Sequence, residues 1–269
     1  MILVNGHPAE SVSALDRGLA YGDGVFRTLR TQAGAPLWWR DQIAKLAADC
    51  AALGLDCPDE ALLRAEVCQV APSGDGVVKI LLTRGAGARG YAPPLEQACT
   101  RIVMTSPLPP HARPDAPIDV RMRWCTLRLA RQPRLAGVKH LNRLENVLAR
   151  GEWSDPAIVE GLLCDDSGAV ISGVMSNVFW VRDGELFTPD LSQCGVAGVA
   201  RTRLLRAAER RGIPTHIGRL PPAAILAADE VMICNSVIGV RRVASLDEAS
   251  WSPAGWTPIL NSALYEEED

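Results

Sequence analysis

Lysine is rare in this chain, so each lysine is a candidate for chemistry. Among the 269 residues there are 28 lysines and arginines, and only Lys45, Lys79 and Lys139 are lysines. Arginine stays protonated near neutral pH, whereas a buried lysine can lose its proton, and only a neutral amine attacks a carbonyl carbon. The alternative is that three lysines survive by chance, so their surroundings must decide.

A second set of candidates lies later in the chain. The loop 195–198 precedes a helix that begins at Val199, and free backbone N–H groups at a helix start form a natural anion site. Asn235 and Ser236 follow a buried strand and offer further donors. Glycine before a helix is common, and the Gly-Lys-Ser/Thr signature of a Walker loop is missing. A reactive lysine together with an anion site is what pyridoxal phosphate requires, because it binds through its aldehyde and its phosphate.

Composition and charge favour a small-molecule enzyme. The chain is 48% hydrophobic and 22% charged, which is typical of a globular protein. A net charge of −3 and a pI near 5.9 give no electrostatic reason to expect nucleic acid or an anionic membrane as partner. No run approaches the roughly 20 apolar residues of a membrane span, and the start lacks a secretion signal. We therefore expect a cytoplasmic protein that binds neither nucleic acid nor a membrane.

The cysteines and histidines do not suggest a metal site. Eight cysteines and four histidines are dispersed along the chain, with no C-x-x-C pair and no short metal-like spacing. We expect buried, reduced thiols and no zinc site.

Strand and helix signals alternate through the first third of the chain. An apolar run over 1–6 ends in Asn-Gly, a favoured hairpin turn. Apolar residues at helical spacing predict a helix over 38–55, and 76–85 and 101–106 are β-rich runs. The segment 106–117 contains five prolines, so it is neither a helix nor a central strand, and we interpret it as a linker.

The second half of the chain begins with the segment around Lys139. From Asn142 onward, apolar residues repeat at intervals of three and four, which predicts an amphipathic helix just past that lysine. The other expected elements are a strand over 118–124, hairpins over 161–173 and 177–189, a helix over 199–211 and a last buried strand over 230–240.

Five stretches, in their order and spacing, resemble a known family. They are DRGLAYGDGVFRTLR, LTRGAGARGY, VKHLNRLENVLAR, MSNVFWV and GVAGVARTRLL. Together they resemble the class IV aminotransferases, which are fold-type IV pyridoxal-phosphate enzymes, over nearly the whole chain from Asn5 to about Val243. KHLNRLE is the most specific motif, and within the family the likeness is greatest to the 4-amino-4-deoxychorismate lyases.

The resemblance implies a two-domain α/β fold like that of D-amino-acid aminotransferase. We expect a smaller N-terminal α/β domain over 1–107, a linker over 108–117 and a larger C-terminal α/β pseudo-barrel domain over 118–269. The family also implies a homodimer that binds pyridoxal phosphate between its domains.

Carried over residue by residue, the resemblance assigns a cofactor site. Lys139 would form the imine with the cofactor aldehyde. The backbone amides of Val199 and Ala200 would bind the phosphate, and Asn235 and Ser236 would complete that site.

Two positions depart from the family pattern. An arginine that grips the phosphate is replaced by Lys45, which keeps the charge but loses the bidentate fork; the alternative is an exposed helix lysine. In the family pattern V-x-E-x-x-x-x-N-h-F, which covers residues 170–179 here, a glutamate should hold the pyridine nitrogen, and this chain has Ser172 at that position. The asparagine of the pattern is Asn177, which the resemblance also assigns to the cofactor. A hydroxyl cannot stabilise a pyridinium as a carboxylate does. Glu160, on a different strand, is one alternative source of a carboxylate.

The resemblance also assigns substrate-binding residues. Arg89 and Tyr91 match positions where D-amino-acid transaminases trap a substrate carboxylate, and Phe26 would contact the substrate as well. Arg84 lies closer to the strand, which leaves a structural role open. Asp23, in AYGDG, is either an acid or part of a Gly-rich turn that lets the backbone approach a ligand or a partner subunit.

The resemblance implies a lyase that converts 4-amino-4-deoxychorismate to 4-aminobenzoate and pyruvate, a step of folate synthesis, and we expect Lys139 to be its general base. Transamination depends strongly on the electron sink that a glutamate strengthens, whereas this elimination creates an aromatic ring, so Ser172 favours the lyase. The first alternative is a D-amino-acid or branched-chain transaminase on the same fold. The second is a non-catalytic relative with a decayed cofactor site, which Ser172 and Lys45 together suggest.

Overall fold

The computed structural model describes residues 1–113 and 118–266, which form two compact α/β units. The first unit comprises Met1–Pro110 and Val138–Arg143. The second comprises His111–Gly137 and the described residues from Leu144 onward. The expected class, a smaller N-terminal α/β domain followed by a larger one, is confirmed.

The expected linker over 108–117 is described only in part. Pro110–Ala112 form a short 3-10 helix, and Leu108 and Ala112 are buried. Residues 114–117 lie outside the described residues.

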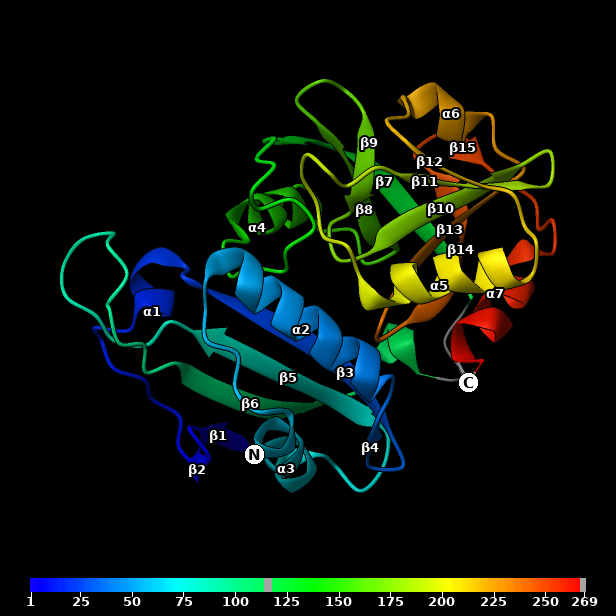
Figure 1. Ribbon diagram of the computed structural model, residues 1–269. Coiled ribbons are helices and arrows are strands. Elements are labelled where there is room, and N and C mark those ends of the chain that lie inside the picture. The colour runs from blue at the N-terminus through cyan, green and yellow to red at the C-terminus, as the bar shows by residue number, and fades with distance from the viewer. Residues whose placement is uncertain (114–117, 267–269) are drawn as a thin grey trace. The chain divides into compact units, whose positions relative to one another are not determined.

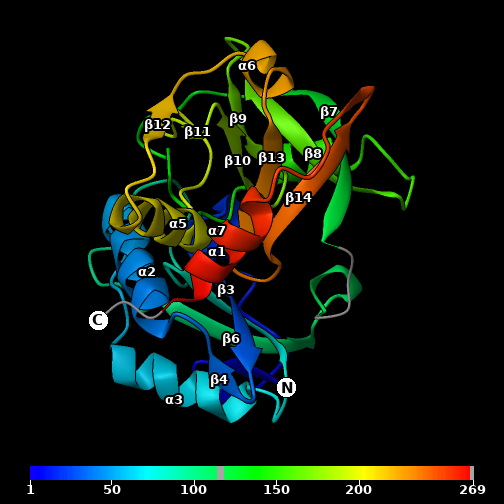
Figure 2. The same ribbon diagram turned by 90° about the vertical axis from the view of Figure 1, so that its right-hand side faces the viewer.

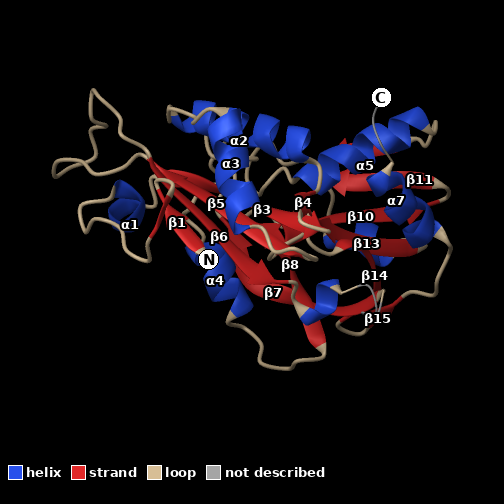
Figure 3. Ribbon diagram, turned by 90° about the horizontal axis from the view of Figure 1, so that it is seen from below, coloured by secondary structure: helices blue, strands red, loops and turns tan. Residues whose placement is uncertain are grey.

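The first unit is built on a six-stranded sheet (Figure 1). The strand order is β2-β1-β6-β5-β3-β4, and each neighbouring pair is antiparallel. The strands are β1 (Ile2–Val4), β2 (His7–Pro8), β3 (Gly24–Gln32), β4 (Ala35–Pro36), β5 (Gly76–Thr83) and β6 (Thr100–Pro107). The helices are α1 (Arg17–Tyr21), α2 (Trp39–Leu53) and α3 (Glu60–Val70). Figure 3 shows α2 and α3 on the same side of the sheet.

Local sequence explains how this unit is built. Asn5 and Gly6 adopt φ of 51° and 84°, which is the hairpin turn predicted from Asn-Gly. Helix α2 ends at Gly54, whose φ of 62° suits glycine. The apolar face of α2 packs with α3 and the inward strand residues in one core, which includes Leu46, Leu63, Val25, Leu29, Ile80 and Val103. Alternate strand residues therefore point away from both helices.

The segment 138–143 lies in the first unit, although we expected it in the second domain. It pairs with the open edge of β3, where β4 does not reach. The Phe26 amide donates to the Lys139 carbonyl (3.0 Å), and the Leu141 amide donates to the Gly24 carbonyl (2.9 Å). Because these bonds join two segments that lie far apart in the sequence, residue periodicity gives no sign of them.

The second unit is built on a nine-stranded mixed sheet. The order is β12-β11-β10-β13-β14-β7-β8-β9, with β15 paired to β14. The strands are β7 (Asp119–Leu129), β8 (Ile158–Asp165), β9 (Val170–Gly173), β10 (Asn177–Arg182), β11 (Glu185–Pro189), β12 (Thr215–Gly218), β13 (Glu230–Asn235), β14 (Gly239–Leu246) and β15 (Ala249–Ser250). The helices are α4 (Leu144–Arg150), α5 (Val199–Arg210), α6 (Pro222–Leu226) and α7 (Trp256–Tyr265).

This sheet curls as the predicted pseudo-barrel requires. Strand β9, at one end of the order, comes back beside β10 and β11. Helices α5 and α7 pack against each other and against β13 and β14, as Figure 2 shows. Both predicted hairpins, β8–β9 and β10–β11, are confirmed. The expected single last strand is wrong, because it is two strands, β13 and β14, joined at a turn before Gly239.

Helix α4 begins at Leu144, two residues later than predicted, and its predicted apolar face does not enter the core. Leu144, Val147 and Leu148 are exposed, and Ala149 is the buried residue of the helix. Among the described residues, no helix combines the length and the apolar character needed to cross a membrane.

Candidate active site

All three lysines of the chain gather around two residues of the first unit, Phe26 and Asp49. The Nζ atoms of Lys139 and Lys79 lie 4.4 Å and 4.9 Å from the centre of the Phe26 ring. The Lys45 ammonium forms an ion pair with Asp49, and the Lys139 backbone N–H donates to Asp49 Oδ2 (3.3 Å). We call these five residues the lysine cluster. The rare lysines therefore mark one place in the fold.

Strand pairing and alternation place the cluster. Phe26 alternates with the core residues Val25 and Leu29 on β3, so its ring lies on the face that α2 and α3 leave open. Lys79 on β5 is opposite Thr28, which puts it on the same face. The edge pairing of 138–143 with β3 then brings the Lys139 side chain over the ring.

The surroundings lower the pKa of Lys139 from 10.5 to about 7. Burial is the largest cause, because the charged ammonium loses solvation. The positive charges of Arg27, Arg143 and Lys79 act in the same direction, and Asp49 opposes them. A large fraction of this amine is therefore neutral near pH 7, which is the form that attacks a carbonyl.

Asp49 supplies the negative charge that offsets the positive charges around Lys139. It is buried on α2, and its Oδ2 lies 3.1 Å from Nη2 of the buried Arg27. Burial lowers the pKa of Lys45, and Asp49 opposes that shift. Lys45 is thus not the exposed helix lysine of our alternative, since its side chain is 20% exposed and ion-paired. Its contact with a phosphate stays a prediction.

The second unit holds the predicted anion site at the start of α5. Gly198 is the N-cap and has no side chain, so the first N–H groups of the helix receive no side-chain cap. Asn177 shapes the preceding loop: its Nδ2 donates to the Val196 carbonyl (2.8 Å), and its Oδ1 accepts from the Gly198 amide (3.1 Å). A Cβ at Gly198 would lie 2.4 Å from that Oδ1, so only glycine fits. Val199 and Ala200, which follow, are buried.

The same loop is fixed by the residue two positions before Lys139. The Gly137 amide donates to the Gly195 carbonyl (3.0 Å), and the Ala197 amide donates to the Gly137 carbonyl (3.1 Å). The chain that leads to the lysine and the loop that leads to α5 are therefore bonded to each other.

Asn235 performs a structural task at the end of β13. Its Oδ1 accepts from the amides of Val237 (2.8 Å) and Ile238 (2.9 Å), and its Nδ2 donates to the Met175 carbonyl (3.1 Å). Ser236 is half-buried in the same turn. The side chain of Asn235 is committed to the turn, and a phosphate contact by either residue stays a prediction.

Ser172 and Glu160 occupy neighbouring strands, and the carboxylate of Glu160 is already in use. Ser172 is buried on β9, where it pairs with Leu163. Glu160 is buried on β8, and its carboxylate accepts four hydrogen bonds of 2.9–3.0 Å, from the amides of Gly161, Val174 and Met175 and from the Ser176 hydroxyl. Burial raises the pKa of Glu160, and these four donors oppose the rise. Glu160 therefore holds the β9–β10 connection together.

The proposed substrate residues divide into two groups. Phe26 lies in the lysine cluster, directly beneath Lys139 and Lys79. Arg89 and Tyr91 lie in the connection between β5 and β6 with both side chains exposed, and the Tyr91 ring packs 5.3 Å from that of Tyr21. Their role as a carboxylate trap stays a prediction.

Sequence reasoning missed the charged neighbours that set the pKa of Lys139. Arg27, Asp49 and Arg143 come from β3, α2 and the edge segment, so only the fold brings them together. One signal was available: Asp49 follows Lys45 by four residues in a predicted helix, a spacing that favours an ion pair.

Comparisons with known proteins point to one family. The family model Amino-transferase class IV matches residues 24–246. The crystal structure of 4-amino-4-deoxychorismate lyase from Pseudomonas aeruginosa is 47% identical, with a TM-score of 0.92 and 98% of each chain covered. The aminodeoxychorismate lyase of Vibrio harveyi is 33% identical over 91% of each chain. A putative branched-chain-amino-acid aminotransferase of Methanocaldococcus jannaschii is 30% identical over 88% of this chain and 83% of its own length.

The residues present fit pyridoxal phosphate, the cofactor that the family implies. The first unit supplies a lysine whose amine is partly neutral near pH 7. The second supplies a helix start that lacks a side-chain cap and a glycine position that tolerates no Cβ. That Lys139 holds the aldehyde carbon, and that the amides of Val199 and Ala200 bind the phosphate, stay predictions.

Proposed function

Since the chain belongs to the class IV aminotransferase family, we propose that it is a pyridoxal-phosphate-dependent lyase that converts 4-amino-4-deoxychorismate to 4-aminobenzoate and pyruvate. The observation that carries this function is the 47% identity, over 98% of both chains, to the Pseudomonas aeruginosa 4-amino-4-deoxychorismate lyase. The product, 4-aminobenzoate, places the enzyme in folate synthesis.

Lys139 has two tasks in this reaction, and both need a neutral amine. It would hold the cofactor aldehyde through its Nζ. The same amine removes the proton from the carbon that bears the substrate nitrogen. When bound, pyridoxal phosphate withdraws electrons from that carbon. The C–O bond to the enolpyruvyl group breaks, the ring becomes aromatic, and the proton ends on the methyl carbon of pyruvate.

Other residues of the chain bind and orient. Val199 and Ala200 donate backbone N–H groups to the phosphate, with Lys45, Asn235 and Ser236 as further candidates, and Asn177 keeps the loop before α5 in shape. Phe26 lies against the substrate ring, and Arg89 and Tyr91 bind a substrate carboxylate, for which a guanidinium is well suited.

Ser172 supports the lyase over the transaminase. The carboxylate of Glu160 is saturated by four donors, so it does not replace the missing family glutamate. The pyridine nitrogen would then receive at most a hydrogen bond from the Ser172 hydroxyl. A weaker electron sink hinders transamination more than an elimination that gains an aromatic ring.

The direct test is the release of pyruvate and 4-aminobenzoate from freshly prepared 4-amino-4-deoxychorismate. Wild type should release both in equal amounts, and Lys139→Ala should release neither. Borohydride reduction followed by peptide mapping should find the cofactor on Lys139. The matched control is Lys79→Ala, which removes a lysine from the same cluster and should keep the covalent cofactor. Cofactor attached to Lys79 would overturn the assignment.

The two alternatives predict other results in the same assays. A transaminase, as the 30% identity to the putative branched-chain enzyme allows, would give no 4-aminobenzoate and would form a keto acid from an amino donor. A non-catalytic relative would stay colourless with added pyridoxal phosphate.

The proposal includes a homodimer, which the exposed side of α4 supports. Leu144, Val147, Leu148 and Met175 are between 56% and 75% exposed. They lie together, because Asn146 of α4 donates to the Val174 carbonyl next to Met175 (2.8 Å). Contiguous apolar side chains of this size commonly mark an interface. In sedimentation experiments Val147→Asp should be monomeric, whereas Ile217→Asp, a control on β12 with a similarly exposed side chain, should remain a dimer.

The proposal also places the enzyme in the cytoplasm. All eight cysteines are free thiols in the structure, which suits a reducing compartment. Fractionation of cells that produce the tagged chain checks this placement.

A further inference from the structure

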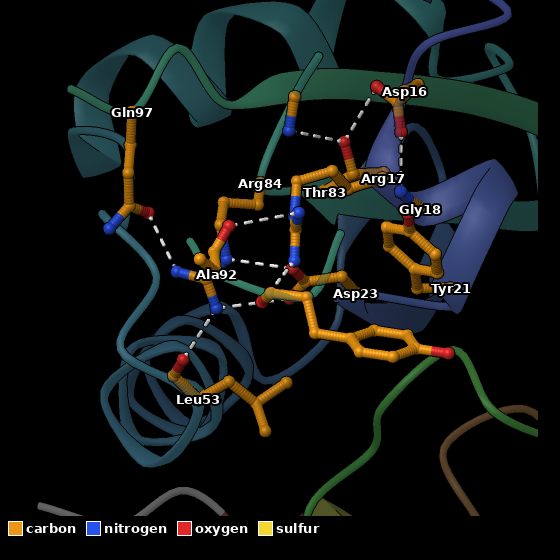
Figure 4. A network of polar contacts seen from close by, with 12 residues as sticks. Asp16, Arg17, Gly18, Tyr21, Asp23, Leu53, Thr83, Arg84, Ala92 and Gln97 are labelled. Carbon is orange, nitrogen blue, oxygen red and sulfur yellow. Dashed lines mark hydrogen bonds and ion pairs between the residues drawn. The ribbon is translucent and has the colours of Figure 1, made fainter. Parts of the chain in front are cut away.

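The connection between β5 and β6, residues 85–99, is held by side chains more than by its own backbone bonds. It carries Arg89 and Tyr91. Two buried arginines of the first unit, Arg17 and Arg84, donate hydrogen bonds to it (Figure 4). Asp23 accepts from both arginines. We call Arg17, Asp23 and Arg84 the arginine clamp.

Arg17, on α1, binds three consecutive carbonyls of the connection. Its Nη1 donates to Gly90 O (2.9 Å) and Ala92 O (3.3 Å), and its Nη2 donates to Tyr91 O (3.0 Å). Its Nε donates to Asp23 Oδ2 (2.9 Å). A guanidinium has five N–H donors in one rigid plane, and no other type of side chain offers this geometry. The backbone on both sides of the Tyr91 side chain is thereby fixed.

Arg84, at the end of β5, holds the other end of the connection. It donates to both carboxylate oxygens of Asp23 (2.9 and 3.1 Å) and to the Gln97 side chain (3.2 Å). It also donates to the carbonyls of Leu53 (2.8 Å) and Gly54 (2.7 Å) at the end of α2. Figure 4 shows both arginines converging on one aspartate. These contacts support the structural role of Arg84 that the sequence left open.

Asp23 joins this clamp to the segment that carries Lys139. Its neighbour Gly22 accepts from Asn142 Nδ2 through its carbonyl (3.2 Å), and Gly24 accepts from the Leu141 amide (2.9 Å). A Cβ at Gly22 would lie 2.5 Å from the Asn142 side chain, and one at Gly24 would lie 2.3 Å from the Leu82 carbonyl. The Gly-Asp-Gly sequence therefore combines two close backbone approaches with one carboxylate.

The charge state of Asp23 suits this task and not that of an acid. Burial alone would raise the pKa of the Asp23 carboxyl, but the hydrogen bonds and charges of Arg84 and Arg17 lower it overall. Asp23 is therefore ionised at neutral pH and has no proton to give. Of the two readings of AYGDG, the structure favours a turn, with the aspartate as its anchor.

We propose that Arg17, Asp23 and Arg84 are positioning residues that set the place of Arg89 and Tyr91 relative to Lys139. The inference rests on the proposed function in one respect, the binding of a substrate carboxylate by the connection 85–99. An ordered connection lowers the entropic cost of binding, since less freedom is lost when the substrate arrives. The clamp therefore acts on substrate affinity and leaves the proton transfer at Lys139 unchanged.

Arg17→Met tests the clamp, because it removes three bonds to the connection while Arg84 still compensates Asp23. Native protein is treated with trypsin, and the product ending at Arg89 is followed by mass spectrometry. We expect cleavage faster by on the order of ten-fold, since local opening exposes the backbone. KM for 4-amino-4-deoxychorismate should rise by about ten-fold while kcat changes by less than about two-fold. Arg17→Lys keeps the positive charge but lacks the forked guanidinium. Its cleavage rate and its KM should lie between those of wild type and Arg17→Met.

Two controls make the result decisive. Arg101→Met breaks another arginine–carboxylate pair of the same unit, with Glu66 (2.9 Å), and should leave both the cleavage rate and KM unchanged. If Arg17→Met does not fold, Gln97→Ala removes the contact of this half-buried side chain with Arg84 and its bond to the Gly54 carbonyl, and it should still raise the cleavage rate.

Cleavage of Arg17→Met at the wild-type rate, or a fall in kcat with KM unchanged, would overturn the inference. Proteolysis needs no substrate. It therefore tests whether the arginine clamp holds the connection 85–99 even if the wild-type protein releases no 4-aminobenzoate and the lyase proposal fails.

Discussion

Asp49 in the first unit and Glu160 in the second are both almost fully buried carboxylates, yet their surroundings differ. Asp49 is 1% exposed and faces cations, with Arg27 and Lys45 as ion-pair partners. Glu160 is 3% exposed and faces neutral donors, which are three backbone amides and one hydroxyl. Both arrangements satisfy a buried charge, but the partners of Asp49 are cations and the hydrogen-bond donors to Glu160 are neutral.

The difference shows where this fold keeps its adjustable chemistry. Neutral donors fix the position of the Glu160 carboxylate and carry no net charge. A substitution at Glu160 should therefore alter the local geometry. A carboxylate among cations acts at a distance, because each charge shifts the pKa of the others. Lys139 reflects this coupling, since Asp49 raises its pKa while Arg27 and Lys79 lower it.

The largest effect is expected for Asp49→Asn, which keeps the shape of the side chain and removes its charge. The buried Arg27 and the half-buried Lys45 would lose the negative charge of Asp49, and the free energy of unfolding should fall by about 3 kcal/mol or more. The pKa of Lys139 should fall further, so covalent attachment of pyridoxal phosphate to the apo-protein should persist to lower pH. Urea denaturation and the pH dependence of attachment measure the two effects.

The control for this change is Asp75→Asn, which removes the carboxylate that Arg30 contacts at the edge of the same unit (3.3 Å). Its side chain is exposed, so the loss should be below about 1 kcal/mol. Equal losses at Asp49 and Asp75 would show that the buried cluster has no special electrostatic role.

Glu160→Gln should be the next largest change, and of another kind. The new amide group would turn its N–H atoms toward existing donors and leave groups unpaired, at about 1–3 kcal/mol each. No charged partner is lost, so the pH dependence of cofactor attachment should match that of wild type. Urea denaturation measures the stability loss. A shifted attachment profile would contradict the distinction between the two carboxylates.

Local features of the fold were predictable from the sequence because they depend on residues close together in the chain. The Asn5-Gly6 turn, the end of α2 at Gly54 and the start of α5 at Val199 all follow from turn, C-cap and loop–helix signals. The family resemblance added the fold class and pointed to Lys139.

Features that depend on distant pairing were not predictable in this way. Nothing near residues 138–143 indicates that they complete the edge of β3. Periodicity along α4 predicted a core-facing apolar side, but Val147 remains exposed because helical spacing cannot tell a core from an interface. The neighbours that lower the pKa of Lys139 come from β3, β5 and the edge segment, and only the tertiary structure assembles them.

Lys79→Met gives a smaller effect that isolates one charge of the cluster. It removes a cation that lowers the pKa of Lys139 and keeps a side chain of similar length. The pKa of Lys139 should therefore rise, and attachment of pyridoxal phosphate to the apo-protein should require higher pH, opposite in sign to Asp49→Asn. The measurement is the rate of attachment between pH 5 and 9. A shift of both variants in one direction would mean that structural damage outweighs charge.

The last effect concerns the stability of the cofactor-free protein. The pKa of Lys139 falls from 10.5 to about 7 on folding, so between these pH values the folded chain binds fewer protons than the unfolded chain, and stability from this group rises with pH. Lys139→Met cannot titrate, so urea midpoints between pH 7 and 10 should rise less steeply than in wild type. An unchanged slope would mean that Lys139 keeps its proton in the fold, and the contrast between Asp49 and Glu160 would then be one of geometry alone.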